Sequence, residues 1–91
     1  MKKIGVADIR DILKDVILDE FYLAKVSDKS DEELLKTNLR RELFLDSLDF
    51  SEMNGEVEER FGIHVTWENS PEEFDNEPTI ENYLKWVNSC I

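Results

Sequence analysis

The chain has 91 residues, of which 22 are acidic and 11 basic, and its formal net charge is −11. Hydrophobic residues make up 41 % of it, so one small domain with its own core is expected over residues 1–91. No apolar run reaches the roughly 18 residues of a membrane span, and Asp8 interrupts the first apolar stretch, so neither a transmembrane helix nor a signal peptide is expected. Cys90 has no partner for a disulfide, which favours a reducing cytoplasm.

The charge is unevenly distributed along the chain. Residues 1–41 hold nine basic and nine acidic side chains, whereas residues 42–81 hold thirteen acidic side chains and one basic, Arg60. The second half therefore repels phosphate backbones and anionic lipids, and neither nucleic-acid binding nor stable membrane binding is expected. A basic protein surface is attracted instead. The alternative is that the acidic residues serve solubility alone.

Helical periodicity predicts a first amphipathic helix over about 7–23. Apolar residues recur there at steps of three and four, with charged residues on the other side. The predicted buried stripe consists of Ile9, Ile12, Leu13, Val16, Ile17 and Phe21.

Two further main helices are predicted over about 47–61 and 80–89. Gly62 is suited to the left-handed residue that ends the first of these, and Thr79 is suited to capping the second. Ser30 and Glu33 have the form of a capping box, which predicts a short helix over about 31–36, and another short helical segment is expected within 66–77. The predicted fold is all-α: a small bundle of three main helices and a short one, with a long crossover loop between the first two main helices.

The start of the helix over 47–61 is the most informative part of the sequence. Asp46 can cap it, with Asp49 at the third helical position, and Ser47 then lies in the first turn, where backbone N–H groups lack helical partners. Such a helix start favours an anion, so a phosphate ester on the Ser47 hydroxyl is compatible with it, although Asp46 and Asp49 oppose the added charge. The alternative is an ordinary serine in a helix cap.

Turning this helix by about 100° per residue separates a core face from an outward face. Leu48 points outward, in the same sector as Glu52, Gly55 and Glu59. An apolar residue backed by carboxylates suits an exposed docking edge.

Catalytic and metal chemistry find little support in the sequence. His64 is the only histidine, and it lies a helix length of roughly 20 Å from Ser47, too far to act as its base. The acidic runs lack the alternating ligands and central glycine of a calcium loop, so no metal site is predicted.

These residues carry a resemblance to the acyl carrier protein family. The run Leu43-Phe44-Leu45-Asp46-Ser47-Leu48-Asp49, the acidic helix after it, Glu58-Glu59-Arg60-Phe61 and a Gly-Ile-x-Val turn are similar to the family's pattern. Leu39 stands where the family has an apolar residue leading into the site, and Thr79-Ile80 begins the last helix as it does in the family. The resemblance extends from the first helix to Val87.

The resemblance implies that Ser47 carries 4′-phosphopantetheine, attached from coenzyme A by a phosphopantetheinyl transferase. The terminal thiol of this group then holds an acyl intermediate as a thioester in fatty-acid or specialised lipid or polyketide-type synthesis. The protein itself does no catalysis and presents the acyl group, as a monomer, to acyl-loading and acyl-processing enzymes with basic docking faces. The implied motif and recognition residues are Asp46, Leu48, Asp49, Glu52, Glu58 and Glu59.

The chain also departs from the family pattern. The family usually has glycine two residues before the motif aspartate, where this chain has Phe44, and Gly55 stands at an outward position that is often apolar. The loss of the glycine leaves a second hypothesis open. In it the domain is an unmodified interaction module of the same fold, which docks partners through its acidic helix.

Overall fold

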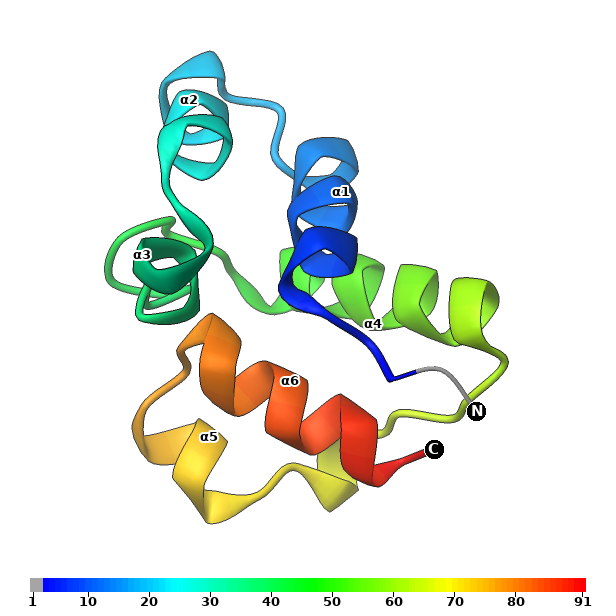
Figure 1. The fold of residues 1–91 in the computed structure, drawn as a ribbon. Helices are drawn as coiled ribbons and strands as arrows, with labels where there is room; N and C mark the ends of the chain where they lie inside the picture. The colour runs from blue at the N-terminus through cyan, green and yellow to red at the C-terminus, as the bar shows by residue number, and fades with distance from the viewer. Residues whose placement is uncertain (1–2) are drawn as a thin grey trace.

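The computed structural model describes residues 3–91, apart from the side chain of Trp67, and confirms a small all-α bundle (Figure 1). Among these residues β pairing is limited to one isolated bridge, between Asn38 and Thr79. The helices are α1 (Val6–Val16), α2 (Glu20–Asp28), α3 (Asp31–Leu35), α4 (Ser47–Phe61), α5 (Glu72–Asn76) and α6 (Ile80–Ser89), with one 3-10 turn at Trp67–Asn69.

The single helix predicted over 7–23 is wrong, because the structure has two helices there, α1 and α2. Ile17 leaves the helical conformation, and the extended Asp19 accepts a hydrogen bond of 2.9 Å from the Phe21 N–H. An aspartate that caps a new helix competes with continuation of the old one. The predicted stripe is buried as far as Ile17, but Phe21, beyond the break, is 64 % exposed.

Arg10 fixes α2 against α1. Its guanidinium donates to the carbonyls of Val26 and Lys29, at the C-terminal end of α2, and to the Asp31 carboxylate at 2.8 Å. The last carbonyls of a helix have no intrahelical partner, so a cation from α1 satisfies them. The crossover to α4 is therefore a folded connection that contains α2 and α3.

The predicted helix boundaries around the other elements are confirmed. Ser30 and Glu33 form the capping box of α3, and the Thr79 side chain accepts a hydrogen bond from the Asn82 N–H at the start of α6. Gly62 ends α4 with φ of 65°, a left-handed conformation that glycine adopts at no steric cost.

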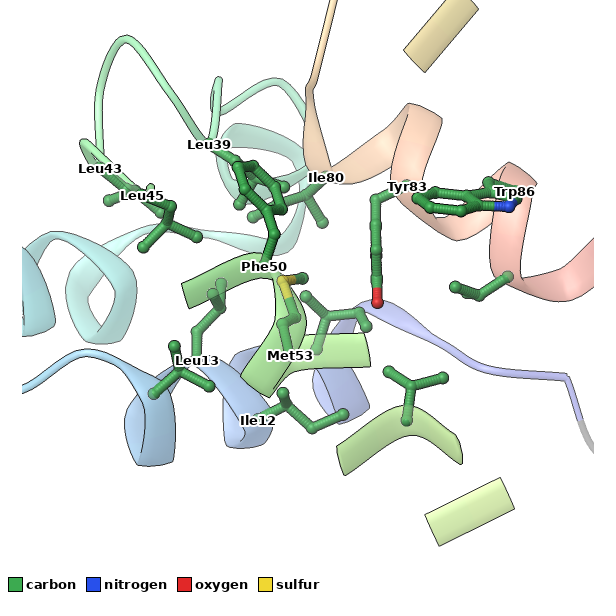
Figure 2. Close-up of a cluster of buried hydrophobic side chains, with 14 of the residues drawn as sticks. Ile12, Leu13, Leu39, Leu43, Leu45, Phe50, Met53, Ile80, Tyr83 and Trp86 are labelled. Atoms are coloured by element: carbon green, nitrogen blue, oxygen red, sulfur yellow. The ribbon is translucent and has the colours of Figure 1, made fainter. Parts of the chain in front are cut away.

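The core lies where α1, α4, α6 and the segment before α4 meet. Figure 2 shows Phe50 and Met53 of α4 in one cluster with Ile12 and Leu13 of α1 and with Ile80 of α6. Three leucines of the crossover point into the same cluster, and they are Leu39, Leu43 and Leu45. The residues that lead into Ser47 are therefore held by the core.

The segment before α4 is also tied to the start of α6 by backbone hydrogen bonds. The Leu39 N–H donates to the Pro78 carbonyl at 2.8 Å, and the Ile80 N–H donates to the Thr37 carbonyl at 3.1 Å. Buried backbone groups need partners of this kind, because solvation by water is lost. The pairing positions the start of α4 relative to α6.

Candidate functional site

The structure places Ser47 as the first residue of α4, with its side chain exposed. Asp46 is the N-cap: its carboxylate accepts from the Asp49 N–H at 2.9 Å, and the Asp49 carboxylate accepts from the Asp46 N–H at 3.1 Å. The predicted cap at Asp46, with Asp49 at the third helical position, is confirmed, and the second hydrogen bond makes the pair a capping box that fixes the backbone on both sides of the serine. The serine hydroxyl therefore projects to solvent from a rigid helix start.

The outward row predicted along α4 is also present. Leu48 is 68 % exposed, and Glu52, Gly55 and Glu59 are exposed as well. Arg60, the one basic residue of 42–81, forms ion pairs with Asp15 at 2.8 Å and with Glu56 at 3.3 Å. Burial, followed by the nearby Asp15 carboxylate, raises the pKa of Glu56. Arg60 is thus paired with Asp15 and Glu56 and does not neutralise the outward row. The row consists of the apolar Leu48 followed by the carboxylates of Glu52 and Glu59.

Glu58 differs from the other acidic residues that were predicted to share a recognition role. It is partly buried, and its Oε2 accepts from the Val65 N–H at 2.9 Å and pairs with His64 Nδ1 at 3.0 Å. These contacts hold the turn after α4, at the end remote from Ser47. The structure does not bring Glu58 together with the row formed by Leu48, Glu52 and Glu59.

Two further predictions concern His64 and metals. His64 lies beyond the C-terminal end of α4, whereas Ser47 begins that helix, so α4 separates them by roughly 20 Å. The serine and the histidine are not brought together. Within residues 3–91 no group of three or more His, Cys, Asp or Glu side chains is arranged to hold a metal ion.

Phe44, three residues before Ser47, has a positive φ of 54°. This left-handed conformation is uncommon for a residue with a side chain, whereas glycine adopts it without steric cost. The Phe44 side chain is 65 % exposed, and its ring lies 5.5 Å from that of Tyr22, centroid to centroid. An aromatic residue in a strained backbone conformation thus stands beside the serine.

A groove of about 260 Å³ adjoins this position. We call it the Phe44 groove. It is lined by the α1–α2 turn (residues 16–19), Tyr22, residues 43–45 and Asp49. Sequence reasoning missed the groove, because it treated residues 17–19 as helix. The available signal was Asp19, which is a strong N-cap residue followed by an acidic first turn.

Within the part of the chain that the structure describes, no helix is long and apolar enough to cross a membrane. A comparison with protein families matches residues 21–87 to the family model described as a phosphopantetheine attachment site. The matched region begins in α2, contains all of α4 and ends in α6. Searches of curated proteins and of solved structures returned no match.

Proposed function

Because the chain belongs to the phosphopantetheine attachment site family, whose members carry covalently attached 4′-phosphopantetheine, we propose that it is an acyl carrier protein modified on Ser47. The single observation that carries the assignment is the exposed Ser47 hydroxyl at the first position of α4, within the Asp46-Ser47-Leu48 motif. The whole of residues 1–91 is proposed to form one carrier domain.

The geometry around Ser47 fits a phosphate ester. The Ser47 Oγ is accessible to a transferase, and its attack on the pyrophosphate of coenzyme A forms a new P–O bond while adenosine bisphosphate leaves. The hydroxyl proton passes to a base of the transferase. Backbone N–H groups of the first turn of α4, which have no intrahelical partner, would stabilise the phosphate. The capping carboxylates of Asp46 and Asp49 hold those groups in place at the cost of some repulsion.

The role of the chain after modification is that of a carrier. When bound, the phosphopantetheine group supplies a terminal thiol that holds an acyl group as a thioester. The chain contributes a fixed attachment point and a docking edge, formed by Leu48, Glu52 and Glu59. Family carriers interact with phosphopantetheinyl transferases and acyl-processing enzymes, and basic faces on those enzymes complement the edge. We place the carrier in fatty-acid or specialised lipid or polyketide-type synthesis, as a non-catalytic cytoplasmic monomer.

Intact-protein mass tests the assignment. The chain is incubated with coenzyme A and a promiscuous phosphopantetheinyl transferase, and a gain of one phosphopantetheine group is expected. Ser47→Ala should abolish the gain. Ser51→Ala is the matched control, because Ser51 is also exposed on α4, one turn further on, and it should leave the gain intact.

The result also decides between the two functions considered. If the wild-type chain gains no mass under conditions that modify a reference carrier, the unmodified interaction module replaces the carrier assignment. If Ser47→Ala still gains the group, the attachment site is wrong.

A further inference from the structure

The Phe44 groove begins at the residues that flank the proposed attachment point. Its lining includes Leu45, two residues before Ser47, and Asp49, two residues after it. A group that is covalently bound to Ser47 therefore starts next to the groove, and its binding there is an intramolecular event favoured by a high effective concentration.

Most of the residues that line the groove are apolar or aromatic. Leu18 in the α1–α2 turn is 90 % exposed and Phe44 is 65 % exposed, and both line the groove together with Tyr22. Exposed apolar side chains gathered around a concave surface mark a binding site more often than isolated ones do. The left-handed backbone at Phe44 adds to this argument, because strained residues persist where their placement is used.

The polar groups in the lining include two acidic side chains. Asp19 and Asp49 contribute carboxylates, and the lining contains no basic residue. Ionised carboxylates accept hydrogen bonds and cannot donate them. The groove therefore suits a ligand with an apolar portion against Leu18 and Phe44 and with N–H or O–H donors toward Asp19 and Asp49.

The phosphopantetheine arm has this arrangement of groups. A carbon with two methyl groups lies close to its phosphate, followed by a hydroxyl and then by two amide N–H groups. An acyl chain, in contrast, is attached at the remote thiol, and its hydrocarbon part offers the two carboxylates no donor. Moving the amide groups out of water also costs less free energy when a carboxylate accepts hydrogen bonds from them.

We propose that the Phe44 groove binds the phosphate-proximal part of the phosphopantetheine arm, with the arm's two methyl groups against Leu18, Tyr22 and Phe44. This inference rests on the proposed modification of Ser47. The arm then lies back along the α1–α2 turn when no partner enzyme holds it, and Phe44 is a positioning residue for the arm.

Nuclear Overhauser spectroscopy on the modified protein tests the proposal. The arm is introduced from isotope-labelled coenzyme A, and intact mass verifies its attachment. Cross-peaks are expected between the arm's methyl protons and the ring protons of Tyr22 and Phe44. Leu18→Ala should lose most of the cross-peak intensity to Tyr22, and Phe44→Gly should do the same, since glycine accepts the positive φ and keeps the fold.

Phe21→Ala is the matched control. Phe21 is an exposed aromatic residue on α2, and it does not line the groove, so the cross-peaks should remain in that variant. The proposal is overturned if the modified protein shows no such cross-peaks, if Leu18→Ala and Phe44→Gly leave them unchanged, or if only the chain of an acylated arm contacts the rings. A missing mass gain, in contrast, overturns the proposed function and removes the basis of this inference.

Discussion

The Tyr83 hydroxyl donates a hydrogen bond of 2.6 Å to the side-chain carbonyl of Asn54, and both residues are buried. The bond joins α6 to the middle of α4, the helix that begins with Ser47. Burial raises the pKa of the Tyr83 phenol, so the hydroxyl remains a donor across the pH range in which the protein is used.

A double-mutant cycle should show strong coupling between these residues. Asn54→Leu leaves the Tyr83 hydroxyl without its acceptor, and Tyr83→Phe leaves the Asn54 amide without its donor. Each single change is expected to lower the free energy of unfolding by about 1–3 kcal/mol, because a buried polar group loses its partner. The combined variant should lose less than the sum of the two. Denaturant unfolding of all four proteins measures this, and strict additivity would contradict it.

The backbone at Phe44 predicts an unusual order of stability. Phe44→Ala and Phe44→Gly both remove the ring, but only glycine adopts φ of 54° without strain. Phe44→Gly is therefore expected to be more stable than Phe44→Ala by about 1 kcal/mol. At ordinary helical or extended positions alanine is the more stable of the two. Equal melting temperatures for the two variants would show that position 44 is not strained.

Gly55 and Gly62 should respond to alanine in opposite directions. A Cβ at Gly55 has nothing within 4 Å, and this residue lies in the interior of α4. Gly55→Ala should therefore raise the free energy of unfolding by about 1 kcal/mol. Gly62→Ala should lower it by about 1 kcal/mol, because Gly62 has a positive φ. Thermal unfolding of both variants checks this, and stabilisation by both would contradict the assigned conformation of Gly62.

Glu42 should stabilise the crossover in a pH-dependent way. Its carboxylate accepts from the Asn38 N–H at 2.7 Å and pairs with Lys29 at 3.4 Å. The backbone hydrogen bond, followed by the charge of Lys29, holds the pKa of Glu42 below its ordinary value of 4.5. A lowered pKa in the folded state means that this stabilisation is present above pH 4.5 and is lost as the pH falls through the folded-state value.

Glu42→Gln should therefore destabilise the protein at pH 7 by at most about 1 kcal/mol, since the Glu42 side chain is 46 % exposed and solvent screens its charge. The difference from the wild type should shrink as the pH falls below 4.5. Urea unfolding at a series of pH values measures it. A difference that grows toward acid pH would contradict the assigned role of Glu42.

Charge reversal on the α4 edge should slow association with a transferase. The double variant Glu52→Lys with Glu59→Lys removes the attraction that steers a basic partner toward Ser47. A double change is needed, because a single rim pair contributes only about 0–1 kcal/mol. The variant Glu72→Lys with Glu81→Lys alters the net charge equally, at exposed positions on α5 and α6.

Stopped-flow association rates at low and high salt measure the steering. The α4 variant is expected to associate more slowly and with a weaker salt dependence than the control. Equal association rates for the two double variants would show that the net charge of the molecule steers the partner, and that the α4 edge has no special role.

Most of the helices could be predicted because their signals are local. The Asp46 and Ser30 capping boxes and the left-handed Gly62 each depend on residues within one helical turn. The outward row of α4 followed from helical periodicity alone. The helix start at Ser47 was predicted from the same local signals, whereas the choice of Ser47 as the attachment site came from the resemblance of residues 43–49 to the family pattern.

The parts that could not be predicted depend on competition between two local conformations or on contacts between residues far apart in the sequence. An apolar stripe continues through Ile17 to Phe21, but the side-chain cap at Asp19 favours the start of a new helix over continuation of the first one. The role of Asn54 depends on its hydrogen bond with Tyr83, which lies far along the chain. The Phe44 groove requires the α1–α2 turn to lie beside residues 43–45, which no local pattern encodes.

The backbone pairing of residues 37–39 with residues 78–80 joins two segments that lie far apart in the sequence. Opening one segment exposes the N–H and carbonyl groups of the other, so both should unfold locally as a single cooperative unit. The amide protons of Leu39 and Ile80 should then exchange with solvent at similar rates. Cleavage of the chain between α4 and α6 that releases α6 would therefore also remove the backbone partners of residues 37–39, which lead toward Ser47. The start of α4 would lose this support even though the Asp46-Ser47-Leu48 motif remained intact.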